Sequence, residues 1–243
     1  MSNGNFPKSI KASSKPDKFC PGCGHSIALK ILGQVIDDLK ISRETLIGVD
    51  IGCALLAWDF FDIPTLQTHH GRTVPVISGF KKADIQKVGI AYVGDGGAYA
   101  IGLQSLIHAA NRNDPITVIV INNTLYGMTG GQMAPTTMPK EITATTPLGK
   151  NENLQGYSIK GPELFSCLEN KKMYLARAMI TQPDVVKIRI KAALEHQIKN
   201  HSFSMVEILS MCPTNWKKDA GNSINFVEKN MQEYYSCQEI KQK

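Results

Sequence analysis

The stretch from residue 88 to residue 123 constrains the fold more than any other part of this sequence. It begins with the apolar run 88–93, which ends at Gly94-Asp95-Gly96-Gly97. Residues 99–111 then have the apolar spacing of an amphipathic helix, and the run ITVIVI leads directly into Asn122-Asn123. Continuous β-branched runs are typical of parallel strands that are covered on both faces. The stretch therefore predicts a strand–helix–strand unit of an α/β protein.

The same alternation continues on both sides of this unit. Residues 25–40 are predicted to form an amphipathic helix, and residues 45–51 a short buried strand. Further along, residues 174–180 and 203–209 are predicted strands, with a helix over 184–199 between them. Repeated units of this kind predict a doubly wound α/β fold, with a mainly parallel sheet and helices on both faces. Ligands of such folds bind at the carboxyl ends of the strands.

The chain is predicted to have three parts. Residues 1–18 are interpreted as an N-terminal arm, residues 19–216 as the ligand-binding domain, and residues 217–243 as a tail with one helix over 224–234. Inside the domain, residues 122–162 are rich in Gly, Thr, Pro and Met and predict a long loop. Long loops inside compact domains are usually functional.

Composition excludes several classes of protein. A hydrophobic content of 42% is too high for intrinsic disorder, and the net charge of +6 comes from dispersed residues, which argues against nucleic-acid binding. No apolar run approaches the roughly 20 residues needed to span a membrane, and the polar start does not resemble a secretory signal. We expect a cytoplasmic protein, in which the six cysteines are free thiols or metal ligands.

Oxygen ligands are expected at one edge of the sheet. The glycines around Asp95 allow a close approach of the backbone, and the helix start that follows favours a phosphate. Asp95 and Asn123 then provide the hard oxygen ligands that Mg²⁺ takes together with phosphate oxygens. Either motif alone is usually an ordinary turn or strand exit. Their separation by the 25 residues from 97 to 121 leaves room for one helix and one strand, which makes the pair more specific.

The cysteines form a second constellation. Cys20 and Cys23 make a CxxC turn, and Cys53 and Cys212 each follow a predicted strand. Such turns occur in zinc sites, in iron–sulfur sites and in redox proteins, although no strand precedes this one as a redox motif would require. Spacing alone leaves zinc and iron–sulfur open. Cys167, in a helical pattern, and Cys237, in the tail, are interpreted as ordinary thiols.

These motifs resemble those of a known family. GDG followed by NN is similar to the signature of thiamine-diphosphate enzymes. The order CPGCGH, IGC, HHGR, GDG, NN, YGMTGGQ and CPTNW, from residue 19 to residue 216, resembles the β subunit of 2-oxoacid:ferredoxin oxidoreductases. The resemblance implies the thiamine-diphosphate-binding fold and three cofactors, which are thiamine diphosphate, Mg²⁺ and a [4Fe–4S] cluster.

The resemblance also implies roles for individual residues. Magnesium would be held by Asp95, Asn123 and the backbone carbonyl of Leu125, and the cluster by Cys20, Cys23, Cys53 and Cys212. His70 would lie beside the cofactor as the catalytic candidate. The full set expected to contact the cofactor is Ile51, Gly52, Cys53, Ala54, His70, Gly94, Asp95, Gly96, Gly97, Asn123, Leu125, Gly127, Met128 and Thr129.

The implied reaction is the oxidative decarboxylation of a 2-oxoacid to CO₂ and acyl-CoA, with electrons passed through the cluster to ferredoxin. None of Glu141, Glu152 or Glu163 lies in a motif suited to activating thiamine, so a partner α subunit is expected to supply that Glu. Further γ and δ subunits remain open, and the chain alone is expected to be inactive. A non-redox thiamine decarboxylase would explain only the GDG and NN motifs. A zinc-stabilised binding module would explain only the cysteines.

The sequence also bears on the substrate. Members specific for 2-oxoglutarate place a basic residue shortly after the cluster cysteine, but here Cys53-Ala54 is followed by Leu55, Leu56 and Ala57. We therefore expect a branched-chain substrate such as 2-oxoisovalerate. Pyruvate and 2-oxoglutarate stay as alternatives, because one methylene contributes only roughly 1–3 kcal/mol to discrimination in an apolar pocket.

Overall fold

A six-stranded parallel sheet forms the centre of the computed structural model, which describes residues 6–14 and 17–240. The strand order is β2-β1-β3-β4-β8-β7, and every neighbouring pair is parallel. The strands are β1 (Thr45–Val49), β2 (Thr65–Gln67), β3 (Val88–Gly94), β4 (Thr117–Asn122), β7 (Tyr174–Met179) and β8 (Ser204–Leu209).

Side chains on the central strands alternate between two apolar cores. On β3, Ile90 and Tyr92 belong to one buried cluster, whereas Ala91 and Val93 belong to the other. On β4, which is buried along its whole length, Ile119 and Ile121 point to the first core. This alternation is the period of two that an extended strand imposes. Both faces of the sheet are therefore covered, as the continuous apolar runs predict.

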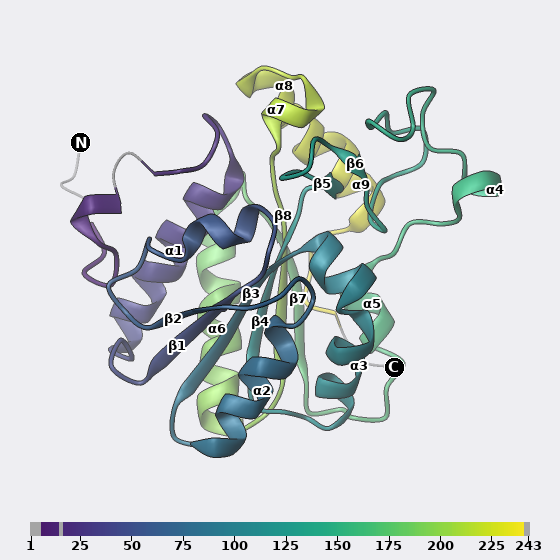
Figure 1. The fold of residues 1–243 in the computed structure, drawn as a ribbon. Helices are drawn as coiled ribbons and strands as arrows, with labels where there is room; N and C mark the ends of the chain where they lie inside the picture. The colour runs from purple at the N-terminus through teal and green to yellow at the C-terminus, as the bar shows by residue number, and fades with distance from the viewer. Residues whose placement is uncertain (1–5, 15–16, 241–243) are drawn as a thin grey trace.

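Helices form a layer on each face (Figure 1). On one face α1 (Gly24–Leu39) packs against α6 (Pro183–Asn200). The other face carries α2 (Thr73–Ala83), α3 (Leu103–Asn111) and the short α5 (Gly161–Phe165). The predicted fold class, a doubly wound α/β fold with a mainly parallel sheet and helices on both faces, is confirmed.

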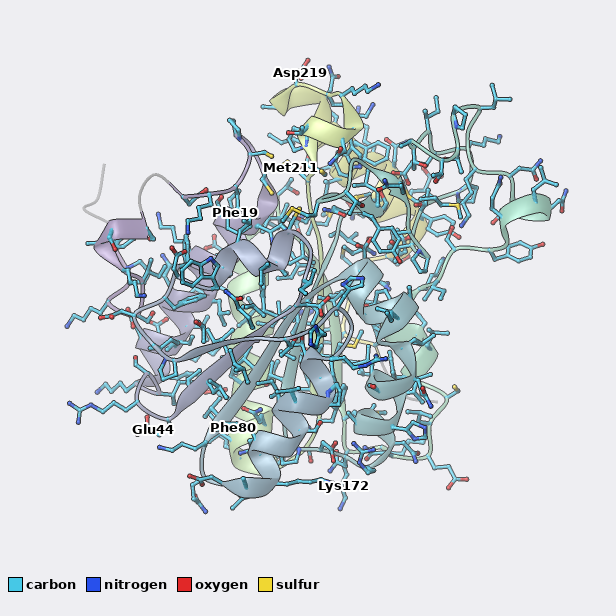
Figure 2. All side chains as sticks on the ribbon, viewed as in Figure 1. Phe19, Glu44, Phe80, Lys172, Met211 and Asp219 are labelled. Carbon is cyan, nitrogen blue, oxygen red and sulfur yellow. The ribbon has the colours of Figure 1, made fainter. Side chains whose placement is uncertain are left out.

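The strand order reverses direction between β1 and β3. β2 lies on one side of β1. β3 lies on the other side of β1 and is followed across the sheet by β4, β8 and β7. Figure 2 shows Met211, which follows β8, near Phe19 at one end of the molecule, and Glu44, which precedes β1, at the opposite end. The carboxyl ends of the strands thus share one edge, and in doubly wound sheets ligands bind at the point of reversal on that edge.

Among the strands of the central sheet and the longer helices, β2 and α2 were not predicted. β2 has only three residues, and α2 contains Pro75 and Gly79, which weaken a helix pattern. The helix predicted over 99–111 begins earlier, with a π-helical turn, η3 (Gly97–Ile101), ahead of α3. The long loop is largely irregular, as expected, and contains only β5 (Leu125–Tyr126), β6 (Gln132–Met133) and α4 (Glu152–Gln155) before α5.

Short helices occupy the remaining connections and the C-terminal part. They are η1 (Ala12–Ser14), η2 (Cys53–Ala57), α7 (Pro213–Trp216), α8 (Ala220–Asn225), η4 (Phe226–Met231) and α9 (Gln232–Tyr235). The helix predicted over 224–234 falls inside the consecutive α8, η4 and α9. Val227, Met231 and Tyr235 are fully buried in the first core, so this segment packs on the domain.

The N-terminal segment also contacts the domain where the structure describes it. Ile10 is buried and forms a β-bridge with Phe61, and Ser9 Oγ donates to Gly33 O at 3.0 Å. Residues 1–5 and 15–16 of the predicted arm lie outside the described residues. The division at residues 18 and 216 stays a prediction. Over residues 6–14 and 17–240, we find no helix with the length and apolar character needed to cross a membrane.

Candidate active site

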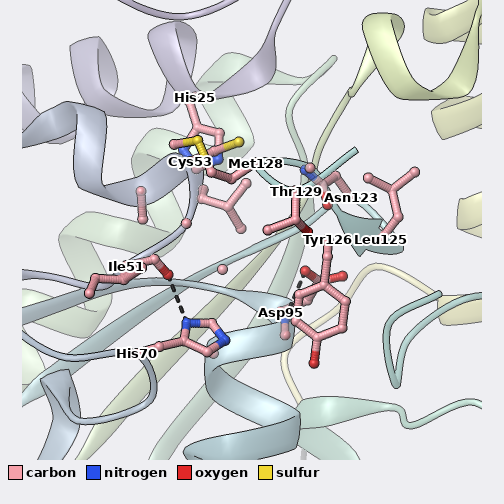
Figure 3. A pocket seen from close by; sticks show the side chains of 17 residues that line it. His25, Ile51, Cys53, His70, Asp95, Asn123, Leu125, Tyr126, Met128 and Thr129 are labelled. Atoms are coloured by element: carbon pink, nitrogen blue, oxygen red, sulfur yellow. Dashed lines mark hydrogen bonds between the residues drawn. The ribbon is translucent and has the colours of Figure 1, made fainter. Parts of the chain in front are cut away.

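A cavity of about 240 Å³ lies at the carboxyl edge of the sheet, between the ends of β1, β3 and β4 (Figure 3). Every residue predicted to contact the cofactor lines it. The lining residues are Ile51, Gly52, Cys53, Ala54, His70, Gly94, Asp95, Gly96, Gly97, Asn123, Leu125, Gly127, Met128 and Thr129, together with His25, Ile121 and Tyr126. The structure thus brings the whole predicted set to one place.

Asp95 and Asn123 form the polar part of this cavity. β3 and β4 are adjacent and parallel, so the residues that follow them meet at the same edge. Asp95 is 3% exposed, and its Oδ2 accepts a hydrogen bond from Thr136 Oγ1 at 2.5 Å. Asn123 is 5% exposed, and its Oδ1 is buried without a hydrogen-bond partner. A buried carbonyl oxygen without a donor beside a buried carboxyl group suits a cation.

Burial raises the pKa of the Asp95 carboxyl to about 7, and the Thr136 hydrogen bond opposes this shift only in part. A carboxylate in such a place carries an uncompensated charge unless a cation accompanies it. The donor set therefore fits the expected Mg²⁺.

Two glycines after Asp95 let neighbouring groups come close. A Cβ on Gly96 would lie 2.1 Å from Tyr126 Cε1, and a Cβ on Gly97 would lie 2.0 Å from Asp50 Oδ2. Only a residue without a side chain fits at either point. Across the cavity, Gly52 has φ of 122° and open space at its Cβ position. Because these glycines have no side chains, the backbone itself forms part of both walls of the cavity.

His70 faces the cavity from the loop before α2. Its Nδ1 lies 2.8 Å from Ile51 O, as the dashed line in Figure 3 shows, and 3.0 Å from the fully buried Asp50 Oδ2. Because a carbonyl oxygen can only accept, the hydrogen bond with Ile51 O assigns the proton to Nδ1 and leaves Nε2 for the cavity. Asp50 is held in turn by Gly71 N at 2.7 Å and Thr73 Oγ1 at 3.1 Å. The orientation of the imidazole is therefore fixed from behind.

The four predicted cluster cysteines lie on segments that contact one another beside this cavity. The Cys20–Cys23 turn packs on the strand end before Cys212, because Gly24 N donates to Met211 O at 3.3 Å. A Cβ on Gly127 would lie 3.1 Å from Cys53 Sγ and 3.7 Å from Cys212 Sγ. Cys53 also lines the cavity itself. The thiols thus lie together next to the expected cofactor.

Two of these thiols, Cys23 and Cys53, have raised pKa values. Burial raises the pKa of Cys23 to about 12 and that of Cys53 to about 11, and the other cysteines of the set add to both shifts. Reactive redox thiols have lowered pKa values. Cys167 and Cys237 lie apart from this group, Cys167 exposed in a turn after α5 rather than in a helix.

The spacing of the sulfurs also bears on the choice of metal. Within residues 6–14 and 17–240, no three His, Cys, Asp or Glu side chains are close enough together to hold a single ion. A tetrahedral zinc needs every sulfur about 2.3 Å from one point. The four cysteines are therefore not arranged around a single ion in the described part of the chain.

Sequence reasoning missed three lining residues and one supporting residue. Tyr126 lies within the YGMTGGQ motif, so its neighbours in the motif were a usable signal. His25 lies in CPGCGH, where its Nδ1 is 2.7 Å from Tyr92 Oη and its ring stacks on Phe19. Ile121 is the next-to-last residue of β4, while Thr136 is a loop residue without any pattern around it. Its contact with Asp95 is visible only in three dimensions.

The fold and this cavity define the class of the protein: a doubly wound α/β domain with a ligand site at its point of strand reversal. Comparison with known proteins identifies the family within this class. Residues 50–208 match the family described as thiamine pyrophosphate enzyme, C-terminal TPP binding domain, thiamine pyrophosphate being another name for thiamine diphosphate.

Individual relatives agree with this family. Over 220 residues the chain is 38% identical to the ketoisovalerate oxidoreductase subunit VorA of Methanothermobacter thermautotrophicus, covering 89% of this chain and 46% of VorA. It is 32% identical over 229 residues to the 2-oxoglutarate synthase subunit KorB of Methanocaldococcus jannaschii, covering 92% and 81%. A solved 2-oxoglutarate:ferredoxin oxidoreductase from Magnetococcus marinus superimposes with a TM-score of 0.80 at 28% identity, over 94% of this chain and 74% of the other.

The chain therefore belongs to the thiamine-pyrophosphate-binding family, as a β-type subunit of the 2-oxoacid:ferredoxin oxidoreductases. It spans about half the length of the VorA relatives that it matches.

Proposed function

We propose that this chain binds Mg²⁺–thiamine diphosphate and one [4Fe–4S] cluster and is the catalytic β subunit of a 2-oxoacid:ferredoxin oxidoreductase. With an α partner it converts a 2-oxoacid and coenzyme A to acyl-CoA and CO₂, and two electrons leave through the cluster to ferredoxin. The substrate that we favour is 2-oxoisovalerate. We place the protein in the cytoplasm, where ferredoxin and coenzyme A are found.

One observation supports this proposal most strongly. The same cavity is lined by Asp95 and the unpartnered Asn123 at one side and by the Cys53 thiol at the other. A thiamine decarboxylase without redox chemistry needs the first pair alone, and a zinc module needs only cysteines. An enzyme that must take electrons from a cofactor needs both within one site.

The residues of this chain have distinct tasks in the proposed reaction. When bound, thiamine diphosphate supplies the electron sink for decarboxylation. Asp95, Asn123 and the Leu125 carbonyl would hold Mg²⁺, which would bind the cofactor's diphosphate. His70, fixed by Ile51 O and Asp50, directs Nε2 at the reacting part of the cavity. Cys20, Cys23, Cys53 and Cys212 would hold the cluster, which would supply an electron acceptor.

Two facts favour 2-oxoisovalerate over 2-oxoglutarate. The cavity wall near Cys53 is apolar, with Ile51, Ala54 and Met128, and no Lys or Arg is among the described lining residues. A distal carboxylate would thus be buried without a cation. The two VorA relatives named for ketoisovalerate are also 38% and 39% identical, against 32–34% for four KorB relatives named for 2-oxoglutarate.

The test uses the complex of this chain with its partner subunits, purified without oxygen. We expect a brown complex with bound iron that reduces ferredoxin in the presence of coenzyme A and 2-oxoisovalerate. The measurement is kcat/KM for 2-oxoisovalerate, pyruvate and 2-oxoglutarate. Because the described lining residues include no Lys or Arg to pair with its distal carboxylate, 2-oxoglutarate should have a kcat/KM at least tenfold lower than that of 2-oxoisovalerate.

Each alternative gives a different result in the same experiment. A preference for 2-oxoglutarate overturns the substrate assignment only. Colourless protein that releases free aldehyde without reducing ferredoxin identifies a non-redox decarboxylase. Colourless protein that contains zinc and has no activity toward any 2-oxoacid identifies a binding module and overturns the proposed function.

A further inference from the structure

Thr124 has a backbone conformation that its side-chain type disfavours. Its φ is 63°, in the left-handed region, and the residue is fully buried. A β-branched residue in this region is an outlier, and it persists only where its surroundings hold it there. Thr124 lies between Asn123 and Leu125, the two residues proposed to hold magnesium through a side chain and a backbone carbonyl.

Four contacts hold Thr124 in this conformation. Its N–H donates to Asn122 Oδ1 at 3.1 Å, and its carbonyl accepts a hydrogen bond from Thr137 Oγ1. The Thr124 hydroxyl lies 2.7 Å from Asn123 O and 2.5 Å from Glu141 Oε1. The contact with Glu141 is the one that reaches from the side chain of Thr124 to a carboxyl group far along the chain.

Glu141 is itself fixed. It is 9% exposed, its Oε2 accepts from Met138 N at 2.9 Å, and its carbonyl accepts from Lys150 N at 2.9 Å. It is absent from the residues that line the cavity. A buried carboxyl group is costly, and neither the cavity nor an ion pair explains this one. Its side-chain contacts are with Thr124 and with its own loop.

The same loop also contacts Asp95, the proposed magnesium ligand that follows β3. Thr136, next to Thr137, donates through Oγ1 to Asp95 Oδ2 at 2.5 Å, and both threonines are fully buried. Residues 134–141 therefore contact the turn after β4 and the carboxyl group after β3 at once. Groups in this position orient the ligands of a metal site.

We propose that Glu141 is a positioning residue of the magnesium site, which acts through the Thr124 hydroxyl. By holding Thr124 in the left-handed conformation, it turns the Asn123 side chain and the Leu125 carbonyl toward one cation. Glycine adopts this conformation without cost, so the presence of threonine is explained by its hydroxyl. The inference rests on the proposed function, since it assumes that Mg²⁺–thiamine diphosphate binds here.

The test is a double-mutant cycle on the full chain in its complex. Mg²⁺ is titrated at saturating thiamine diphosphate, and binding is followed by the change in tryptophan fluorescence. In the wild-type background, Glu141→Ala should weaken Mg²⁺ binding by about 10–100-fold, the usual effect of losing a group that orients a metal ligand. In the Thr124→Gly background the same change should cost less than about threefold, because glycine needs no support.

A matched control is Glu152→Ala, which removes a carboxylate from α4 in the same long loop without touching Thr124. It should leave the Mg²⁺ affinity unchanged. Iron content and the thermal midpoint are measured for each variant. Equal losses for Glu141→Ala in both backgrounds mean that the loop is only structural, and this overturns the inference. Wild-type affinity in Glu141→Ala overturns it as well. If the wild type binds no Mg²⁺–thiamine diphosphate, the proposed function fails first.

Discussion

At the scale of single residues, close contacts around Gly97 define one wall of the candidate site. The Cβ position of Gly97 lies 2.0 Å from Asp50 Oδ2, and Asp50 cannot move easily because Gly71 N and Thr73 Oγ1 both hold its other oxygen. Asp50 also lies behind His70. A side chain at position 97 would thus disturb the support of the imidazole.

We expect Gly97→Ala to destabilise the protein by about 1–3 kcal/mol, the usual cost of overpacking a filled core. Since Asp50 would be displaced, the variant should also lose activity in the complex. The measurement is the urea midpoint of unfolding, together with kcat/KM.

The matched control for this change is Gly79→Ala in α2, where nothing lies within 4 Å of the Cβ position. There the helix preference for alanine should stabilise the protein by roughly 0.5–1 kcal/mol. If both variants are stabilised, the close contact at Gly97 is not present in solution.

A pH dependence follows from Glu141. Burial raises the pKa of its carboxyl to about 7, against 4.5 for an ordinary Glu. Between these values the unfolded chain releases this proton while the folded chain keeps it, so stability falls as the pH rises from about 4.5 to about 7. In metal-free protein, Glu141→Gln should make this decrease in the free energy of unfolding smaller, by at most about 3 kcal/mol. Urea unfolding at pH 5 and pH 7.5 measures it, and an unchanged slope would refute the assignment.

At the scale of elements, the C-terminal segment closes the edge of the sheet at β7. Arg177 N donates to Gln238 O at 2.9 Å, and Ile240 N donates to Leu175 O at 2.9 Å. Covering an edge strand in this way removes a site of aggregation. The Arg177 side chain, fully buried, joins the same region to α5 and β8: it pairs with Glu207 and, through two bonds of 2.6 Å, with Glu163.

We expect Arg177→Met to destabilise the protein by about 3–5 kcal/mol, because Glu207 would remain buried without its partner. Arg189→Met removes a more exposed partner of Glu239 and should cost no more than about 1 kcal/mol. Thermal unfolding of both variants compares the two arginines. Similar midpoints for the two would show that the buried network contributes little.

At the scale of the whole molecule, the candidate site contains only part of the groups that thiamine chemistry needs. Asp95 is the one carboxylate among the described lining residues of the cavity, and we propose above that it holds magnesium. Glu141 supports Thr124, Glu163 pairs with Arg177, and Glu152 lies on α4. These assignments agree with a thiamine-activating Glu that comes from a partner subunit.

We therefore expect the isolated chain to bind Mg²⁺–thiamine diphosphate but to convert no 2-oxoacid, and the addition of the α partner to restore turnover. Anaerobic assays of ferredoxin reduction before and after mixing measure this. As a control, heat-denatured α partner should restore nothing. Full activity of the isolated chain would contradict the expectation.

Much of the fold was predictable because its signals are local. The runs that became β3, β4, β7 and β8 carry continuous apolar side chains, so their strands were predicted within a residue or two of their ends. The candidate site was predictable because a parallel sheet brings the residues after each strand to one edge. Asp95 and Asn123, 28 positions apart, meet there for that reason.

Other features depend on contacts between distant segments, which no local pattern encodes. α2 carries Pro75 and Gly79 and is stabilised by packing on β3 rather than by its own preferences. Thr136 and Glu141 occur in an irregular loop, and their roles exist only because that loop folds back against the ends of β3 and β4.

By itself, the sequence determined the α/β class and the edge of the sheet where the ligand site lies, because periodicity and motif spacing act over short distances. Most of the residues that line the cavity were implied by the resemblance to a known family. The tertiary structure alone decided the strand order, the close approach of Cys53 and Cys212, the orientation of His70 by Asp50, and the support of Thr124 by Glu141. Each of these is a contact between segments that are far apart along the chain, and its energy depends on how the whole chain packs.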